Sequence, residues 1–297
     1  MSTSGNPSRA GANASPMSND AVASRIQRAL AERFGEQIAV DGGFAGLGAV
    51  AKIAARRSHR RFLSRAIEPE LLRLLCACAL SAPSKSDLQQ SDIVIVDDVS
   101  IRKGIVATIP DMPWINDAPA FLVFVANGER LPLICKLRGK PFPNDHLDQF
   151  FNAVVDSAIV LATFIGAAAA VGLGCCPISA IRDHAGIVSD LLRLPERVVP
   201  VAGLCVGWPA QAGEITPRLS LPTTVILDRY RERDLAAEID AYDRRRAAVR
   251  PYPRQRDPRR WGEASFYGWS EDKARQYADP ARADFADYVR AKGFRLE

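Results

Sequence analysis

Apolar residues near the beginning of the chain recur with the period of a helix and mark one face: Val22, Ile26, Leu30 and Phe34. Ser18 or Asn19 precedes this face and can accept hydrogen bonds from the first helical turn. Gly35 follows it and can take the left-handed conformation that ends many helices. The pattern therefore predicts an amphipathic helix between residues 18 and 35.

Continuous apolar runs rich in β-branched and aromatic residues indicate strands. They cover residues 92–97, 120–126 and 198–206, and the first two have the composition of central strands. Helical segments are expected at residues 68–80, 148–171, 235–246 and 284–291. Strands separated by helices favour a layered fold built from both kinds of element.

The longest apolar segment, from Ser157 to Cys176, carries no charge over about twenty residues, which is the length of a membrane span. Asp156 lies at its beginning, and Gly172 and Gly174 would end a helix before the span is complete. A helix that is apolar on all sides can instead form the centre of a soluble core or of a dimer. We favour this buried helix, and the membrane span is the alternative.

The chain divides into four parts. Residues 1–17 are rich in small polar residues, lack the apolar core of a signal peptide and are expected to be disordered. Residues 18–55 form an N-terminal helical extension, and residues 56–228 form the core. Residues 229–297 make an excursion rich in Arg, Pro, Tyr and Trp and end in a helix that completes the same domain.

The composition is that of a globular protein with a sizeable core, since 47% of the 297 residues are hydrophobic and 25% are charged. A formal net charge of +5 and a pI near 9.0 would attract phosphates or acidic ligands. This charge does not by itself imply nucleic acid.

The six cysteines and three histidines have no spacing typical of a zinc site or of a secreted disulfide framework. Cys175 and Cys176 are adjacent, but no basic residue adjoins them in the sequence to lower a thiol pKa, which argues against a redox pair. We therefore expect no bound metal, and a location in the reducing cytoplasm.

Four segments carry candidate chemistry, and each also has an ordinary structural explanation. Residues 56–61, R-R-S-H-R-R, are either a solvated basic turn or an anion site, because guanidinium groups match phosphate oxygens. Residues 82–90 are either a surface turn or a set of hydrogen-bonding groups for a polyol or a heterocycle. Residues 172–183 either end a helix or let a flat ring approach the backbone. Arg218, behind Pro217, is either exposed or closes a phosphate pocket.

Five short motifs follow one another along the chain: R-R-S-x-R at residues 56–60, A-P-S-x-x-x-x-Q at 82–89, G-L-G at 172–174, P-I-x-x-I-R at 177–182, and G-L-C-V-G-W-P with P-R-L between 203 and 219. Together they resemble the nitroreductase superfamily, and specifically its larger NADPH-dependent oxygen-insensitive nitroreductase and flavin reductase group. The C-terminal region, from W-S-E at residues 269–271 onward, is also similar to the tail of that group.

The resemblance implies an α+β fold with three α/β/α layers and a central mixed sheet, assembled as a domain-swapped homodimer. The long helix would lie at the dimer interface, with one FMN in each of two interfacial clefts, so that residues 56–228 form the FMN-binding core. NADPH or NADH would give a hydride to N5 of FMN, and a nitroaromatic, quinone or flavin acceptor would receive it with ping-pong kinetics. The resemblance implies no protein nucleophile and no nucleic-acid partner.

The resemblance also assigns the phosphate end of FMN. Arg56, Arg57 and Ser58 would hold this end, and Arg218 would bind the same phosphate from a later segment. Arg60 would lie near the pyrimidine edge of the flavin, where a fixed cation stabilises negative charge that develops on reduction.

Five further positions would meet the rest of the cofactor. Ser84 and Gln89 would contact the flavin ring or the ribityl chain. Pro177 and Ile178 would line the face of the ring, and the backbone N–H of Ser179 would reach N5. These contacts, like those to the phosphate, are implied by the resemblance.

The chain departs from the group at several of these places. The family usually has Asn at the position of Asp87 and Pro-Trp at Gln90-Ser91. The larger group often has Gly-Gly at Ser179-Ala180, and it has Lys at Thr216. The residues before Arg56 are additional to the family core. These differences leave the electron acceptor open, because substrate contacts come from variable loops.

Two alternative functions and one prediction about the nucleotide follow. A specialised member of the same fold could dehalogenate, or fragment its own flavin. Residues 244–260 place arginine beside aromatic residues, a composition that could bind nucleic acid. The same arginines would suit the 2′-phosphate of NADPH, and we predict that one of them makes NADPH preferred over NADH.

Overall fold

The computed structural model describes residues 17–230 and 232–297 and contains a four-stranded sheet. The strands are β1 (Ser91–Ile95), β2 (Ala120–Asn127), β3 (Gly174–Ile178) and β4 (Val198–Gly207), in the order β1-β2-β4-β3. The three strands predicted from apolar runs are confirmed. The fourth, β3, comes from the glycine-rich segment after the long helix and was not among the strands predicted from apolar runs.

Two expectations about the sheet were wrong. Residues 92–97 were predicted to form a central strand, but β1 lies at the edge and pairs only with β2 in the described chain. The sheet was expected to be mixed, but every neighbouring pair of its strands is antiparallel. A helical connection is required between parallel strands and permitted between antiparallel ones, so the order of elements could not distinguish the two. One isolated parallel bridge, between Ser58 and Cys175, lies beside β3.

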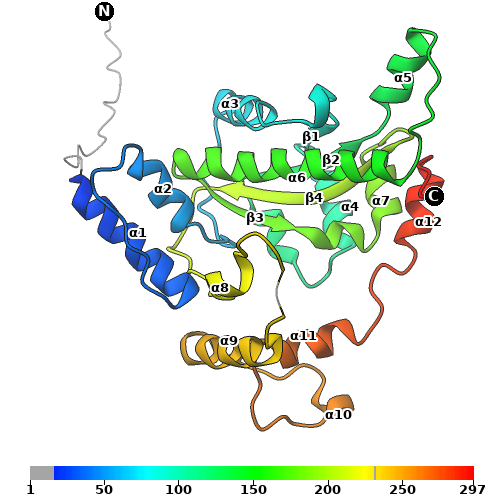
Figure 1. Cartoon of the computed structure of the whole chain (residues 1–297). Helices are drawn as coiled ribbons and strands as arrows, with labels where there is room; N and C mark the ends of the chain where they lie inside the picture. The colour runs from blue at the N-terminus through cyan, green and yellow to red at the C-terminus, as the bar shows by residue number, and fades with distance from the viewer. Residues whose placement is uncertain (1–16, 231) are drawn as a thin grey trace, which may run out of the picture.

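Helices cover both faces of the sheet, which confirms the three-layer arrangement. The helices α3 (Pro69–Leu80) and α6 (Leu147–Ala170) lie on the face shown uppermost in Figure 1, and α4 (Val99–Ala107) and α7 (Ala185–Leu191) lie on the other. Alternation along β2 supplies both cores, because successive side chains point to opposite faces. Phe124 packs edge-on against Phe164 of α6, with 5.8 Å between the ring centroids.

The helix α6 confirms the long helix predicted from the apolar run. Among the described residues it is the one helix with the length and composition of a membrane span. Only 33% of its most apolar 18-residue stretch is buried within this chain. Phe164 and Ala168 face the sheet, while Ala162 and Gly166 are exposed. One side of α6 is therefore core, and the other side is an uncovered apolar surface.

The N-terminal extension consists of α1 (Asn19–Phe34) and α2 (Leu47–Ala54). The predicted signals at the ends of α1 are confirmed, because the Ser18 side chain accepts a hydrogen bond from the N–H of Ala21 and Gly35 has φ +74°. The two helices share a small apolar cluster with Ile215, near the end of the core. The disorder expected for residues 1–17 concerns a segment that lies, except for Met17, outside the described residues.

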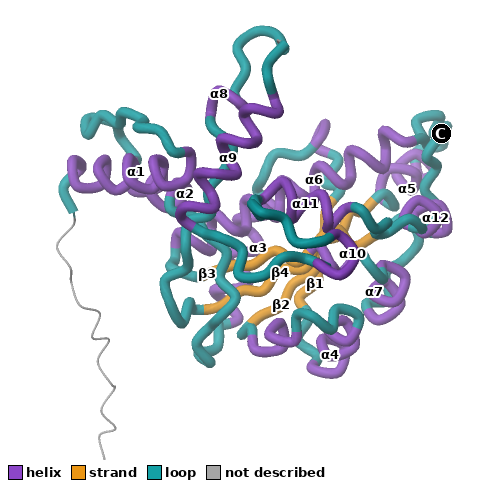
Figure 2. The backbone as a smooth tube through the Cα atoms, turned by 90° about the horizontal axis from the view of Figure 1, so that it is seen from below, coloured by secondary structure: helices purple, strands orange, loops and turns teal. Residues whose placement is uncertain are grey.

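The C-terminal region adds the helices α8 (Leu221–Thr224), α9 (Leu235–Val249), α10 (Pro258–Trp261), α11 (Trp269–Tyr277) and α12 (Phe285–Ala291). Figure 1 shows α9, α10 and α11 beside one another and away from the strands, and in the view from below in Figure 2 α10 and α11 overlap the region of the strands. The α9 and α11 helices meet through Tyr242 and Trp269, whose ring centroids are 5.2 Å apart. As predicted, α12 buries Val289, and it does so against residues near the first turns of α6. The helix α5 (Arg130–Leu137) projects from the connection between β2 and α6.

Candidate functional site

The basic residues 56–61, called here the arginine segment, run alongside β3. The N–H of His59 donates to the carbonyl of Cys175 at 3.0 Å, and Ser58 forms the parallel bridge with the same residue. A Cβ at Gly174 would lie 2.7 Å from the His59 ring, so this glycine is needed for a side chain of the protein itself. This backbone pairing fixes the path of the arginine segment beside β3, and its side chains are not needed for the pairing.

A second basic segment, Thr216 to Arg218, meets the arginine segment after β4 and a loop. Ser58, Arg60, Thr216 and Arg218 line one hollow of about 490 Å³. The structure therefore brings together three of the predicted phosphate and flavin contacts, although they lie far apart in the sequence. Arg246 and Arg250 line the same hollow from the C-terminal region, so its charge is strongly positive.

Arg56 and Arg57 differ in what their side chains contact. Arg57 is partly engaged by the protein, because its Nε donates to the Ala55 carbonyl at 3.0 Å and its Nη1 donates to the Gly213 carbonyl at 2.6 Å. No hydrogen bond joins the Arg56 guanidinium to an acceptor within residues 17–230 and 232–297, and Arg56 lines a hollow beside Gly174. Arg56 is the more available of the two for an outside anion.

Arg33, near the end of α1, is a basic residue of this region that the sequence interpretation missed. It is only 9% exposed, and its Nη2 donates to the carbonyls of Ala54 and Arg56 at 3.1 and 2.5 Å. Its Nη1 donates to the Thr216 carbonyl at 3.3 Å. Burial, followed by the positive charges of Arg218 and Arg56, lowers the pKa of Arg33. The only signal in the sequence was a charged residue one position before the end of an amphipathic helix.

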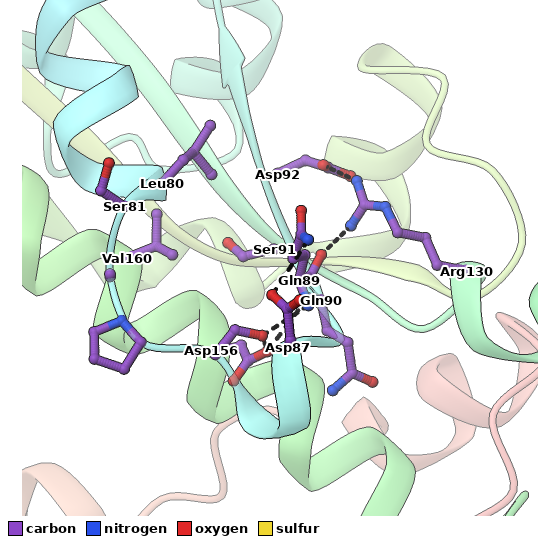
Figure 3. A pocket seen from close by; sticks show the side chains of 13 residues that line it. Leu80, Ser81, Asp87, Gln89, Gln90, Ser91, Asp92, Arg130, Asp156 and Val160 are labelled. Carbon is purple, nitrogen blue, oxygen red and sulfur yellow. Dashed lines mark hydrogen bonds and ion pairs between the residues drawn. The ribbon is translucent and has the colours of Figure 1, made fainter.

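Residues 82–90, called here the serine loop, are held by a buried carboxylate on α6. Asp156 is 2% exposed and accepts hydrogen bonds from Ser84 Oγ at 2.8 Å, the N–H of Lys85 at 2.9 Å and the N–H of Gln90 at 3.3 Å. Ser84 Oγ in turn accepts the N–H of Gln89 at 2.7 Å. Figure 3 shows Asp156 beside this loop, and both line a hollow of about 590 Å³.

The two groups of predicted contacts are not adjacent in one chain. The arginine segment and residues 216–218 are called the arginine half, and the serine loop with Asp156 is called the serine half. Asp156 lines the hollow of the serine half, whereas Ala169, farther along α6, lines the hollow beside Arg56. At 1.5 Å of rise per residue, about 20 Å of helix separates these two positions, and about 8 Å separates Val160 and Ile165, the nearest α6 residues that line the two hollows.

Comparison with known proteins gives a match over most of the chain. The family model described as "Nitroreductase family" matches residues 53–208, and the model "Nitroreductase family, C-terminal domain" matches residues 216–297. The chain belongs to the nitroreductase family.

Curated relatives agree with this assignment. The chain is 30% identical over 224 residues to a protein of Bacillus subtilis named FMN reductase [NAD(P)H], with 73% of this chain and 90% of that protein covered. It is 32% identical over 185 residues to the oxygen-insensitive NADPH nitroreductase of Salmonella typhimurium, covering 61% of this chain and 74% of the other.

Solved structures agree as well. The NADPH:FMN oxidoreductase from Vibrio harveyi, complexed with NAD+, superimposes with a TM-score of 0.70 at 28% identity and covers 82% of this chain and 97% of its own. The hypothetical oxidoreductase YcnD from Bacillus subtilis gives a TM-score of 0.75 at 28% identity, with 84% and 98% covered. The α+β nitroreductase fold predicted for the chain is thus confirmed.

The segment at the end of β3 departs in part from the expected nitroreductase arrangement. Pro177 and Ser179 are exposed, but Ile178 is 3% exposed and packs in the core formed with α4 and α7. The Ile178 side chain therefore does not line an open face in this chain, and only its backbone is available to a ligand. The alternation of a strand explains this, because residues on either side of a buried position point outward.

Gln90 is a buried polar residue directly before β1. It is 1% exposed, and neither polar atom of its side chain has a hydrogen-bond partner among the described residues. An amide buried without partners is unfavourable by about 1–3 kcal/mol, which indicates that a group outside the described chain satisfies it. Gln90 borders the hollow of the serine half, in the region where the resemblance expects a ligand.

The adjacent cysteines of this nitroreductase have the properties of core residues. Burial raises the pKa of Cys175 to about 12, and the nearby positive charge of Arg56 only partly opposes it. Burial also raises the pKa of Cys176. A thiol that stays protonated at neutral pH is a poor nucleophile, so the pair contributes packing. No cluster of metal-ligating side chains was found among the described residues.

Proposed function

We propose that this nitroreductase is an FMN-dependent NAD(P)H oxidoreductase that takes a hydride from NADPH and delivers it to a nitroaromatic, quinone or flavin acceptor. The observation that carries the proposal is the convergence of Ser58, Arg60 and Arg218 on one cationic hollow. The relatives named FMN reductase and NADPH-flavin oxidoreductase support the same cofactor and donor.

The residues present fit the phosphate end of FMN. Arg56 has a guanidinium without a protein acceptor in the described chain, and Ser58 and Arg218 border the neighbouring hollow. Guanidinium groups and a hydroxyl are the donors that a phosphate dianion prefers. Arg57 would support this site chiefly by holding the Gly213 loop, and Arg218 would close it from the other segment.

The residues of the serine half fit the neutral part of the cofactor. Ser84 and Gln89 border the second hollow, and the unpartnered amide of Gln90 offers donors and an acceptor to a ring edge or a ribityl hydroxyl. Bound FMN would supply the hydride chemistry, accepting the hydride at N5 and passing it to the second substrate. The chain's own residues would position the ring, exclude water and place Arg60 where negative charge develops.

A second copy of the chain would bring the two halves together. The exposed side of α6 is apolar, and with α2 it lines a hollow of about 620 Å³ whose walls include Ile53, Ile159 and Ala162. Covering this surface with another copy would also place the serine half of one chain opposite the arginine half of its partner. We infer a homodimer with FMN in two interfacial clefts, in preference to a membrane span.

The cationic hollow would also hold the nicotinamide nucleotide. Arg246 and Arg250 line it together with the aromatic residues Tyr252 and Trp269, which suits a phosphate beside a stacked base. Arg250 also pairs with Glu214 of the same hollow at 3.5 Å, whereas Arg244 does not line the hollow and pairs with Asp240 at 2.9 Å. We therefore expect the preference for NADPH to depend on Arg246 or Arg250.

Donor and acceptor would use the same cleft in turn, which gives ping-pong kinetics. The six cysteines are free thiols, and this supports a reducing compartment, which we propose is the cytoplasm. Variable loops at the cleft determine the acceptor, so dehalogenation and flavin fragmentation remain alternatives to be tested by assay.

The decisive experiment is an absorption spectrum of the purified full-length protein with quantification of the flavin released on denaturation. We expect a yellow protein with about one FMN per chain, a dimer by light scattering and oxidation of NADPH in the presence of a quinone. A colourless protein that also fails to take up added FMN would remove the proposal.

A further inference from the structure

The helix α1 lies before the part of the chain that the family model matches, which begins at residue 53. Its last turn nevertheless contacts both segments of the arginine half. Arg33 is the residue that makes these contacts, and its side chain is almost completely removed from solvent. This position calls for an explanation, because a long cationic side chain is seldom buried unless it is paired.

Arg33 joins two stretches of backbone that are remote in the sequence. One nitrogen donates to the carbonyls of Ala54 and Arg56, at the beginning of the arginine segment. The other donates to the carbonyl of Thr216. The connection is also made by the backbone, since the N–H of Arg218 donates to the carbonyl of Arg33 at 2.7 Å.

Contacts around Arg33 hold the end of α1 in place. Glu36 accepts the N–H of Leu221 at 3.0 Å, which ties the turn after α1 to the chain beyond Arg218. Arg245 of α9 lies against Gly35, where an added Cβ would come within 2.3 Å of its side chain, and donates to the Arg218 carbonyl. The end of α1 is thus fixed from two sides.

The charge of Arg33 is matched by carbonyl oxygens, and no ion pair with a carboxylate was found for it among the described residues. Arg33 is hydrogen-bonded to the backbone of both Arg56 and Arg218, and its pKa is lowered by burial first and then by the charges of these two arginines. An anion bound between the two segments would relieve this repulsion. The arrangement is therefore favourable for a phosphate group.

We propose that Arg33 is a positioning residue that holds the arginine segment and residues 216–218 at the separation required by the phosphate group of the bound flavin nucleotide. The inference rests on the proposed function, and it assigns to the N-terminal extension a role in cofactor affinity. Arg33 acts through Arg56, Ser58 and Arg218, which meet the phosphate, and its own guanidinium stays on the backbone carbonyls.

The test compares FMN with riboflavin, which lacks the phosphate, on full-length protein stripped of flavin. The variants are Arg33→Gln and Arg33→Lys, and the matched control is Arg28→Gln, an exposed arginine on the same helix. Affinities are measured by quenching of flavin fluorescence. The unfolding temperature of each protein, with and without inorganic phosphate, gives a readout that does not depend on flavin.

In Arg33→Gln we expect the affinity for FMN to fall ten- to a hundredfold, and that for riboflavin to change less than twofold. Phosphate should raise the unfolding temperature of the parent and of Arg28→Gln but not of Arg33→Gln. Arg33→Lys should lie between the two, because an ammonium group keeps the charge but cannot span both segments. If Arg33→Gln does not fold, Arg33→Lys is used in its place. Its loss of affinity for FMN should again exceed its loss of affinity for riboflavin.

Equal losses of FMN and riboflavin affinity would show that Arg33 is only a structural clamp and would overturn the inference. Failure of the parent to bind either flavin would refute the proposed function, and the phosphate measurement would then decide the role of Arg33. The inference is also refuted if phosphate stabilises Arg33→Gln as much as Arg28→Gln, or stabilises none of the proteins.

Discussion

The arginine half and the serine half of the site are held together by opposite chemistry. In the arginine half, cationic side chains donate to backbone carbonyls, as Arg33 does to Thr216 and Arg57 does to Gly213. In the serine half, a buried carboxylate accepts from backbone N–H groups, as Asp156 does from Lys85 and Gln90.

Under the proposed function, this difference would let one site serve both ends of a nucleotide. Backbone carbonyl oxygens at the arginine half accept hydrogen bonds from arginine side chains. The side of this half that faces the hollow therefore has a surplus of positive charge, which suits an anion. In the serine half, backbone N–H groups donate hydrogen bonds to the buried carboxylate of Asp156. Its hollow is bordered by hydroxyl and amide side chains such as Ser84 and Gln89, which suit uncharged polar groups.

The largest effect is expected from separating the two halves. Ala162 is exposed on α6 in the apolar surface that we assign to the dimer interface. An arginine there would be a buried, unpaired charge, so Ala162→Arg should convert the dimer to a monomer and abolish retention of FMN on purification. Light scattering and the flavin content of the same sample provide the measurement.

The control for this variant is Ala107→Arg, which changes an exposed alanine of α4 on the opposite side of the sheet. It should remain dimeric and yellow. A monomeric Ala162→Arg that retains FMN would show that one chain completes the site alone, and the comparison of two halves from two chains would be wrong.

The next largest effect is expected at Asp156. In Asp156→Ala the N–H groups of Lys85 and Gln90 lose their acceptor, so the free energy of unfolding should fall by about 3–4 kcal/mol. Asp156→Asn keeps one oxygen and should lose about 1–2 kcal/mol. Urea unfolding measures both, with the exposed Asp148→Asn on the same helix as control.

The Asp156 variants also test which part of the flavin binds to the serine half, through their affinities for FMN and riboflavin. Because the serine half is assigned to the ring and the ribityl chain, Asp156→Asn should weaken FMN and riboflavin by the same factor. A loss confined to FMN would place the phosphate at the serine half and reverse the assignment.

A smaller effect is expected on the choice of nucleotide. The Arg250 side chain is held by Thr216 Oγ1 at 3.1 Å, and Arg246 lies over the Tyr252 ring at 4.1 Å from its centroid, both at the cationic hollow. Replacing the arginine that contacts the 2′-phosphate with alanine should lower kcat/KM for NADPH ten- to a hundredfold, which corresponds to a loss of about 1.5–3 kcal/mol of transition-state stabilisation. The kcat/KM for NADH should not change.

Arg244→Ala is the matched control, since Arg244 is exposed and bound to Asp240 on its own helix. Steady-state kinetics with both nucleotides decide the matter. If Arg246→Ala and Arg250→Ala keep the parent's ratio of NADPH to NADH activity, the hollow does not recognise the 2′-phosphate. A parent that prefers NADH would contradict the prediction before any variant is made.

The smallest effect is expected from the titration of His59. Burial, and then the charges of Arg57 and Arg56, lower its pKa in the folded chain below the ordinary value of 6.5. The unfolded chain therefore binds a proton more readily, and stability that is fully present above pH 6.5 should be lost as the pH falls through the folded pKa. In His59→Gln this loss should disappear from the pH dependence of urea unfolding, and an unchanged dependence would contradict it.

Much of the fold was predictable because its signals are local. The period of apolar residues defined α1 and α6, Ser18 and Gly35 marked the ends of α1, and the apolar runs defined β1, β2 and β4. The order of the motifs pointed to the family, because each motif is read without knowledge of its spatial neighbours. The edge position of β1 and the antiparallel pairing had no such signal, since they depend on which strands meet.

The site was predictable only in part, for the same physical reason. Ser58, Arg60 and Arg218 were found as basic or polar residues in motifs, but their convergence on one hollow is a property of the folded chain. Arg33 contacts a residue 183 positions away, and Asp156 contacts one 72 positions away. The sequence by itself determined the helices α1 and α6, the strands β1, β2 and β4, and several residues that can bind an anion. Only the tertiary structure decided what holds those residues in place, because contacts between remote segments leave no periodic pattern along the chain.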